Sequence, residues 1–260
     1  MPRFAANLSW MFAEHAFPDR FQAAADAGFE AVELQLPYDH DPAMLAVRRE
    51  SAGVAQIMFN APPGDLEAGE YGLASLPGRE QEFRDSIGQA LEYAGALGCG
   101  QLHVLAGIVP EGESAEGCWD LYLENVAWAA QLCGKSKVGI LLEPINTVER
   151  PGYLVYLTAQ ARRAVDAVGE NNVGIQYDFH NAQLMEGRLT RTLEANISHI
   201  RHMQIAGLPG RTPPDEGEIN CAYAFDLIDR LGYAGWVGCE YRPKDSTLDS
   251  LAWAKPYGIG

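Results

Sequence analysis

The sequence lacks the features that mark several large classes of protein. Its five cysteines are odd in number and form no CxxC pair, which argues against both a disulfide framework and a zinc ribbon. No apolar run approaches the roughly 20 residues that a membrane-spanning helix needs. The opening segment MPRFAANLSWMF also lacks the charged region, apolar stretch and cleavage site of a secretory signal. We therefore expect a protein of the reducing cytoplasm.

Positive charge is scarce as well. The chain has 19 Lys and Arg against 35 Asp and Glu, a net charge of -16. Such a surface repels polyanions, so we expect neither nucleic acid nor an acidic membrane as a partner. No GxGxxG follows the first expected strand and no GxxxxGK[ST] occurs, which disfavours the usual dinucleotide and P-loop sites. A small-molecule substrate remains, and self-association is left open.

Short apolar segments alternate with longer ones whose apolar residues recur at helical spacing, the pattern of repeated βα units. Strands are expected at residues 3–9, 30–36, 53–60, 101–107, 138–143, 173–178, 199–206 and 235–241. Helices between them are expected to end at left-handed glycines, among them Gly28, Gly98, Gly169 and Gly232. About eight units without a linker predict a single-domain (β/α)8 TIM barrel over residues 1–260.

One segment breaks this rhythm. APPGDLEAGEYGLASLPGREQ, at about residues 61–80, is rich in Gly and Pro and follows the third expected strand. Loops at the carboxyl ends of barrel strands carry the active site, so we expect this one to lie over it as a lid. Trp10 and Phe59, near the ends of strands one and three, are candidate walls of the pocket.

Side-chain alternation along the later strands predicts which residues face the barrel interior. In the fifth strand, Gly139, Leu141 and Glu143 share one face, and Val138 and Ile140 turn outward to the helices. The same rule places on the inner face Gly174, Gln176 and Asp178; Ile200, His202 and Gln204; and Trp236, Gly238 and Glu240. His202 is therefore expected to be a hydrogen-bonded interior residue. His103 either faces the substrate or satisfies a polar contact in the core.

Four oxygen-bearing side chains thus end strands five to eight: Glu143, Asp178, Gln204 and Glu240. Carboxylates that share a small site need a counter-charge, because like charges raise a pKa or recruit a cation. With oxygen ligands alone, Mg²⁺ or Mn²⁺ is favoured over Zn²⁺. The alternative for each acid taken singly is a helix cap or a surface ion pair.

Eight strings from the first expected strand to the last carry a resemblance to a known family: RFAANLS, FNAPPGD, LPGREQEFRD, LLEPIN, QYDFH, HMQIAG, GEIN and GWVGCEYRP. With these strings the chain resembles the hydroxypyruvate isomerase family, which includes 2-oxo-tetronate isomerases and belongs to the xylose isomerase-like barrels. The resemblance implies a metal-assisted isomerase that interconverts hydroxypyruvate and tartronate semialdehyde through an enediolate, or acts likewise on a four-carbon 2-oxo acid. Glu143 and Glu240 would be its acid and base, and both would bind the metal with Asp178 and Gln204.

The resemblance also points to residues around the substrate. In related ketose epimerases an acid six residues beyond the first metal glutamate touches substrate, and Glu149 stands there. Family members carry a histidine three residues after the metal aspartate, where this chain has Asn181 and, one position earlier, His180. They also read GRHEP where this chain reads GRTPP, which puts Thr212 in place of a histidine. Arg211 either pairs with a substrate carboxylate or is a solvated loop residue.

Two other functions remain open at this stage. Apurinic endonucleases share the superfamily, but they use histidine-rich sites with several metals, and the net charge opposes DNA binding. A catalytically inactive protein that binds a sugar acid is the second alternative, since the substrate shell departs from the family pattern. The glutamate pair argues against it.

Overall fold

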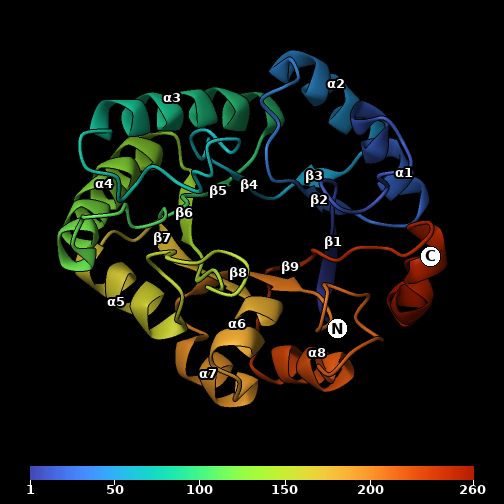
Figure 1. The fold of residues 1–260 in the computed structure, drawn as a ribbon. Helices are drawn as coiled ribbons and strands as arrows, with labels where there is room; N and C mark the ends of the chain where they lie inside the picture. Colours follow the sequence, from blue (N-terminus) through green and yellow to red (C-terminus); the bar gives the residue numbers. More distant parts are fainter.

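The β-strands of the computed structural model, which describes all 260 residues, run parallel around a barrel ringed by helices (Figure 1). The strands are β1 Arg3–Asn7, β2 Ala31–Glu33, β3 Ala55–Gln56, β4 Phe59–Asn60, β5 Gln101–His103, β6 Gly139–Leu142, β7 Val173–Asp178, β8 Ile200–Ile205 and β9 Trp236–Cys239. Since β3 and β4 are halves of one predicted strand, the nine segments make eight barrel strands. The predicted (β/α)8 fold is therefore confirmed.

The third strand closes the ring. β3 pairs with β2, β4 pairs with β5, and the sheet order is β3-β2-β1-β9-β8-β7-β6-β5-β4. The backbone N–H of Asn60 still donates to Gln35 O, at 2.9 Å, while Ala61 N donates to His103 O at the same distance. The segment 55–61 thus connects the two ends of the sheet, and although regular strand geometry is interrupted at Ile57 and Met58, Ile57 N still donates to Val32 O at 3.0 Å and Met58 O accepts from Leu34 N at 3.4 Å.

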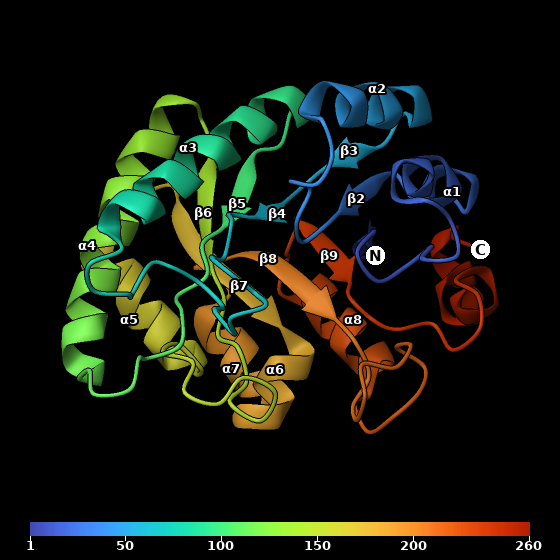
Figure 2. The same ribbon diagram turned by 45° about the horizontal axis from the view of Figure 1, so that its top comes forward.

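The helices form the outer layer, as both ribbon views show (Figure 2). They are α1 Arg20–Asp26 after the 3-10 turn η1 Phe17–Asp19, α2 Pro42–Ala52, α3 Glu80–Leu97, α4 Ala115–Lys135, α5 Thr158–Val168, α6 Phe179–Met185, α7 Leu189–Asn196, α8 Cys221–Arg230 and the 3-10 segment η2 Leu248–Tyr257. The four predicted terminal glycines all have positive φ, and Gly98 and Gly169 are left-handed C-caps. No helix has the length and apolar character needed to cross a membrane.

The apolar side chains on the inner and outer faces of the strands belong to two different clusters. Val138 and Ile140 belong to the large cluster between strands and helices, whereas Leu141 joins a small cluster with Ala5 and Ala31 inside the barrel. The alternation predicted for the fifth strand is therefore confirmed.

The expected position of Ile200 was wrong. The register between β7 and β8 pairs Ile175 with Ile200 but Gln176 with His202, so Arg201 is an extra residue. This irregularity turns Ile200 into the outer core, while His202 keeps its place inside the barrel.

A substitution at Gly238 tests how tightly the barrel interior is packed. A Cβ at this position would lie 2.1 Å from Oε2 of Glu33, a side chain with 0% exposure. We expect Gly238→Ala to lower the free energy of unfolding by about 1–3 kcal/mol, the usual cost of overpacking. Urea denaturation followed by circular dichroism measures it.

Gly88→Ala is the matched control. Gly88 lies on the exposed face of α3, where an added Cβ meets nothing within 4 Å. Replacing a helical glycine by alanine should gain about 0.5–1 kcal/mol. A Gly238→Ala protein as stable as the wild type would contradict the placement of Glu33 inside the barrel.

Candidate functional site

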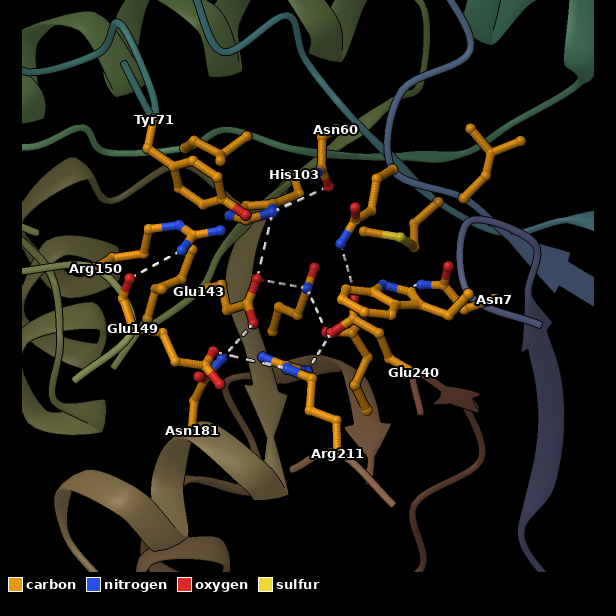
Figure 3. Close-up of a pocket in the computed structure, with 18 of the residues that line it drawn as sticks. Asn7, Asn60, Tyr71, His103, Glu143, Glu149, Arg150, Asn181, Arg211 and Glu240 are labelled. Carbon is orange, nitrogen blue, oxygen red and sulfur yellow. Dashed lines mark hydrogen bonds and ion pairs between the residues drawn. The ribbon is translucent and has the colours of Figure 1, made fainter. Parts of the chain in front are cut away.

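A pocket of about 250 Å³ opens at the carboxyl ends of the strands (Figure 3). Its lining residues are Asn7, Trp10, Leu34, Gln35, Met58, Asn60, Tyr71, His103, Leu105, Glu143, Ile145, Glu149, Arg150, Gln176, Asn181, Gln204, Arg211, Glu240 and Arg242. Tyr71 comes from the long loop between β4 and α3, so this loop does reach the pocket. Trp10 is a wall, as expected, but Phe59 is wholly buried in the outer core and is not.

Glu143 follows β6 directly and is only 7% exposed at the floor of the pocket. Its Oε1 accepts a hydrogen bond of 2.9 Å from Asn181 Nδ2, and its Oε2 accepts one of 2.9 Å from Gln176 Nε2. Burial raises the pKa of Glu143 well above its usual value, and the negative charges of Glu240 and Asp178 add to the rise.

Glu240 reaches the same pocket from the end of β9. Its Oε2 accepts a hydrogen bond of 2.7 Å from Arg211 Nη1. Its Oε1 accepts bonds of 3.1 Å from Gln35 and 3.3 Å from Asn7. Burial raises the pKa of Glu240 to about 7, and the guanidinium of Arg211 opposes this rise. β7 and β8 separate the strands that carry the two glutamates, so their carboxyl groups enter the pocket from different sides.

Asp178 ends β7 and makes the helix cap that the sequence left open as an alternative to metal binding. Its Oδ1 accepts from the backbone N–H of His180 at 2.8 Å and so caps α6. Its Oδ2 accepts from Asn181 Nδ2 at 2.9 Å and from Arg211 Nη1 at 3.3 Å. Asp178 therefore lies behind the pocket wall, one layer below the lining side chains.

Arg211 is the cation of this site. Its side chain leaves the loop after β8 from a residue with φ of +53° and is nearly buried. Burial disfavours its charge, but Asp178 and Glu240 more than offset that effect and raise the pKa of Arg211. Of the two roles expected from the sequence, the solvated one is excluded by this burial, while contact with a substrate carboxylate stays a prediction.

The four expected metal ligands have the oxygen donors that Mg²⁺ and Mn²⁺ prefer. Gln204 Oε1, however, accepts from Gln176 Nε2 at 2.7 Å, and Arg211 bridges Asp178 and Glu240. No group of three or more His, Cys, Asp or Glu side chains is arranged to hold a metal ion. The donor chemistry thus fits a hard cation, and such an ion would have to replace Arg211 at two carboxylates.

The other predicted substrate residues lie at different depths. Glu149 lines the pocket, accepts from Asn146 Nδ2 at 3.1 Å and stands 3.8 Å from Arg211 Nε. Asn181 also lines it. His180 is buried behind Glu149, with Nε2 3.6 Å from Oε1 of that residue, and does not line the pocket.

Thr212 does not face the substrate. Its hydroxyl donates to Glu216 O at 3.2 Å within the loop after β8, and it is absent from the pocket lining. The residue at which GRTPP departs from the family string therefore lies in the loop after β8, outside the pocket lining of this chain.

His103 combines the two roles left open for it. It lines the pocket, and its Nδ1 lies 3.1 Å from Asn60 Oδ1 and 3.4 Å from Glu143 Oε2. Burial lowers the pKa of His103 to about 3, so the ring is neutral at physiological pH.

Sequence reasoning missed Glu33, which lies beneath the pocket. Its Oε2 is 2.6 Å from His202 Nε2, and its Oε1 accepts bonds of 2.8 Å from both Asn7 and Gln204. His202 is thus the hydrogen-bonded interior residue that was expected. The available signal was the alternation in EAVELQL, which puts Glu33 and Gln35 on one face.

Comparison with known proteins gives a consistent family. The model of the xylose isomerase-like TIM barrel family matches residues 21–257. The chain is 49% identical to a 2-oxo-tetronate isomerase of Cupriavidus necator over 257 residues, 99% of each chain. It is 44% identical to the hydroxypyruvate isomerase of Escherichia coli, over 99% of this chain and 100% of that protein.

Solved structures agree on the fold. A Brucella melitensis protein described as an AP endonuclease, family 2, superposes with a TM-score of 0.97 at 46% identity and 99% coverage of both chains. An L-ribulose 3-epimerase gives a TM-score of 0.78 at 19% identity, over 98% of this chain and 86% of that one, and so supports the fold alone. The chain belongs to the xylose isomerase-like TIM barrel family, in the group of the hydroxypyruvate and 2-oxo-tetronate isomerases.

Proposed function

We propose that this protein is an aldose–ketose type isomerase that interconverts hydroxypyruvate and tartronate semialdehyde, or moves the carbonyl group of a four-carbon 2-oxo acid in the same way. The observation that carries the proposal is the pair of buried glutamates, Glu143 and Glu240, at one small pocket. Relatives that match over nearly the full chain are named for these two reactions, which supports the substrate class.

The reaction needs a base and an acid on neighbouring carbons. An ionised carboxylate removes a proton from the hydroxyl-bearing carbon next to the carbonyl, and an enediolate forms. A protonated carboxyl then gives a proton to the former carbonyl carbon, while the hydroxyl proton passes to the former carbonyl oxygen. Arg211 favours the ionised form of Glu240, whereas burial and neighbouring anions favour the protonated form of Glu143. We therefore assign Glu143 and Glu240 together as the acid and base of the reaction from the 2-oxo acid.

Amide donors hold both carboxyl groups in place. Asn181 and Gln176 donate to Glu143, while Gln35 and Asn7 donate to Glu240. Carboxyl groups fixed in this way lose little freedom when substrate binds, so proton transfer can occur over short distances. Arg211, beside Glu240, also places positive charge near the negative charge that develops on the enediolate.

A divalent metal remains part of the proposal. Glu143, Asp178, Gln204 and Glu240 would hold Mg²⁺ or Mn²⁺, which would polarise the carbonyl and stabilise negative charge on oxygen. All five cysteines are free and buried, which supports a reducing compartment, for which we propose the cytoplasm.

A DNA-repair activity is the rival that the description of the Brucella protein raises. Two properties disfavour it in this chain. The net charge of -16 repels a phosphate backbone, and the pocket of about 250 Å³ is of the size of a small metabolite. The isomerase names of the curated relatives also weigh against it.

Glu143→Gln and Glu240→Gln test the proton-transfer pair. Each change removes an ionisable group but keeps its shape, so turnover of hydroxypyruvate should fall roughly 10²- to 10⁴-fold. Formation of tartronate semialdehyde is followed by NMR, and the thermal midpoint of each variant establishes that it is folded. Glu92→Gln, on the exposed face of α3, is the matched control and should keep full activity. Wild-type turnover by a folded Glu143→Gln or Glu240→Gln protein would disprove the assignment.

Metal removal tests the second part of the mechanism. Dialysis against a chelator should lower turnover by about 100-fold or more, because Lewis-acid stabilisation is worth several kcal/mol. Added Mn²⁺ or Mg²⁺ should restore the rate, and bound Mn²⁺ is detected independently by electron paramagnetic resonance. Undiminished turnover by protein shown to be free of metal would contradict the proposed metal site. Arg211 would then be the only cation at the carboxylates.

A further inference from the structure

Three arginines line the pocket: Arg150, Arg211 and Arg242. They differ in the contacts they already make. Arg211 is committed to Glu240 and Asp178, with Nη1 at 2.7 Å and 3.3 Å from their oxygens. Its charge is therefore largely balanced within the protein.

Arg150 is the half-buried arginine without a carboxylate partner. Its Nη1 donates to the backbone oxygen of Glu149 at 2.8 Å, and no Asp or Glu side chain lies within ion-pair distance of it. A guanidinium has five N–H donors in a planar fork. The remaining donors of Arg150 have no carboxylate or carbonyl acceptor in the protein, and those that do not contact the Tyr71 hydroxyl are available to a ligand in the pocket.

Tyr71 holds Arg150 in this position. The guanidinium carbon lies 4.3 Å from the centre of the Tyr71 ring, and Figure 3 shows the two side chains stacked on the Glu149 side of the pocket. This contact is a cation–π interaction, which orients the guanidinium without neutralising its charge. The guanidinium N–H donors of Arg150 are therefore oriented before any ligand binds.

The loop that carries Tyr71 is itself fixed. Gly72 has φ of +124°, and a Cβ there would lie 2.6 Å from Leu105 O, so the loop packs directly against the backbone after β5. Arg79, at the end of the loop, donates two hydrogen bonds, of 2.6 Å and 3.2 Å, to Glu70, the residue before Tyr71. The Tyr71 ring that contacts Arg150 is thus carried by a loop whose backbone is closely packed at Gly72.

Arg242 is less suited to bind an anion. It is exposed, with its guanidinium carbon 4.5 Å from the Trp10 ring centre. An exposed cation is screened by water and salt, whereas a partly buried one acts in a medium of lower dielectric constant.

We infer that Arg150 is the specificity-determining residue that binds the carboxylate of the 2-oxo acid, and that the stacked Tyr71 positions it. This inference rests on the proposed function, since it assigns one end of that substrate. With the carboxylate on Arg150, the carbonyl and hydroxyl carbons extend toward Glu143 and Glu240. The fork of a guanidinium matches a carboxylate through two parallel hydrogen bonds.

The test compares a charged substrate with a neutral one of the same length. Hydroxypyruvate and dihydroxyacetone differ in that a carboxylate in the first is a hydroxymethyl group in the second. Arg150→Gln should raise the KM for hydroxypyruvate about 10- to 100-fold, the usual worth of hydrogen bonds to a charged group. The KM for dihydroxyacetone should stay unchanged. Arg150→Lys keeps the charge without the fork and should lose less.

Arg84→Gln is the matched control, because Arg84 also stacks on an aromatic ring, that of Trp128, but lies outside the pocket. It should leave both KM values unchanged. Selective loss for hydroxypyruvate in Arg242→Gln or Arg211→Gln, together with a normal Arg150→Gln protein, would overturn the assignment. Equal loss for both substrates in Arg150→Gln would also overturn it, because that result indicates a structural role.

Calorimetry with D-glycerate and glycerol separates this inference from the proposed function. D-Glycerate carries the carboxylate but no carbonyl group, so its binding does not depend on turnover. We expect the wild type to bind it more tightly than glycerol, and Arg150→Gln to lose that preference. An inactive wild-type protein that shows this pattern would refute the isomerase function and keep the carboxylate site. Equal preference for glycerate in both proteins would refute the site.

Discussion

Three carboxyl groups and one guanidinium share a buried space at the mouth of the barrel, and the rest of the site depends on how their charges are balanced. Glu143, Asp178 and Glu240 are each more than nine-tenths buried, and Arg211 pairs with two of them. One positive charge cannot neutralise three anions, so protons must remain on part of the set unless a cation enters. A site under this constraint is suited to exchanging protons with a bound substrate.

A lower layer of polar groups supports this arrangement. Glu33 accepts hydrogen bonds from Asn7 and Gln204, and those two residues also contact the layer above, at Glu240 and Gln176. Each amide therefore links an acid below the pocket to a group at its floor. Buried polar networks of this kind are costly when incomplete, so the loss of one amide would leave polar groups of both layers without a partner.

The sequence predicted the fold and the strand-end acids well because both follow from local rules. Period-two alternation brings Glu143 and Glu240 inward, whatever surrounds them. Contacts between distant segments were not predictable in this way. The pairing of Arg211 with Asp178 needs the conformation of a loop 33 residues further along the chain, and the outward turn of Ile200 needs an irregular register with β7. Glu33 was visible in its strand pattern, but only its contact with His202 shows its role.

In the proposed reaction, this pocket abstracts a proton from the carbon beside the carbonyl of a short 2-oxo acid. The most direct test is proton NMR of the wild-type protein in D₂O, with a panel of three- and four-carbon 2-oxo and 2-hydroxy acids and Mg²⁺ or Mn²⁺ present. We expect enzyme-dependent conversion of one 2-oxo acid, with solvent deuterium appearing at the carbons that exchange protons. Binding of such acids without conversion or deuterium incorporation in any of them would contradict it.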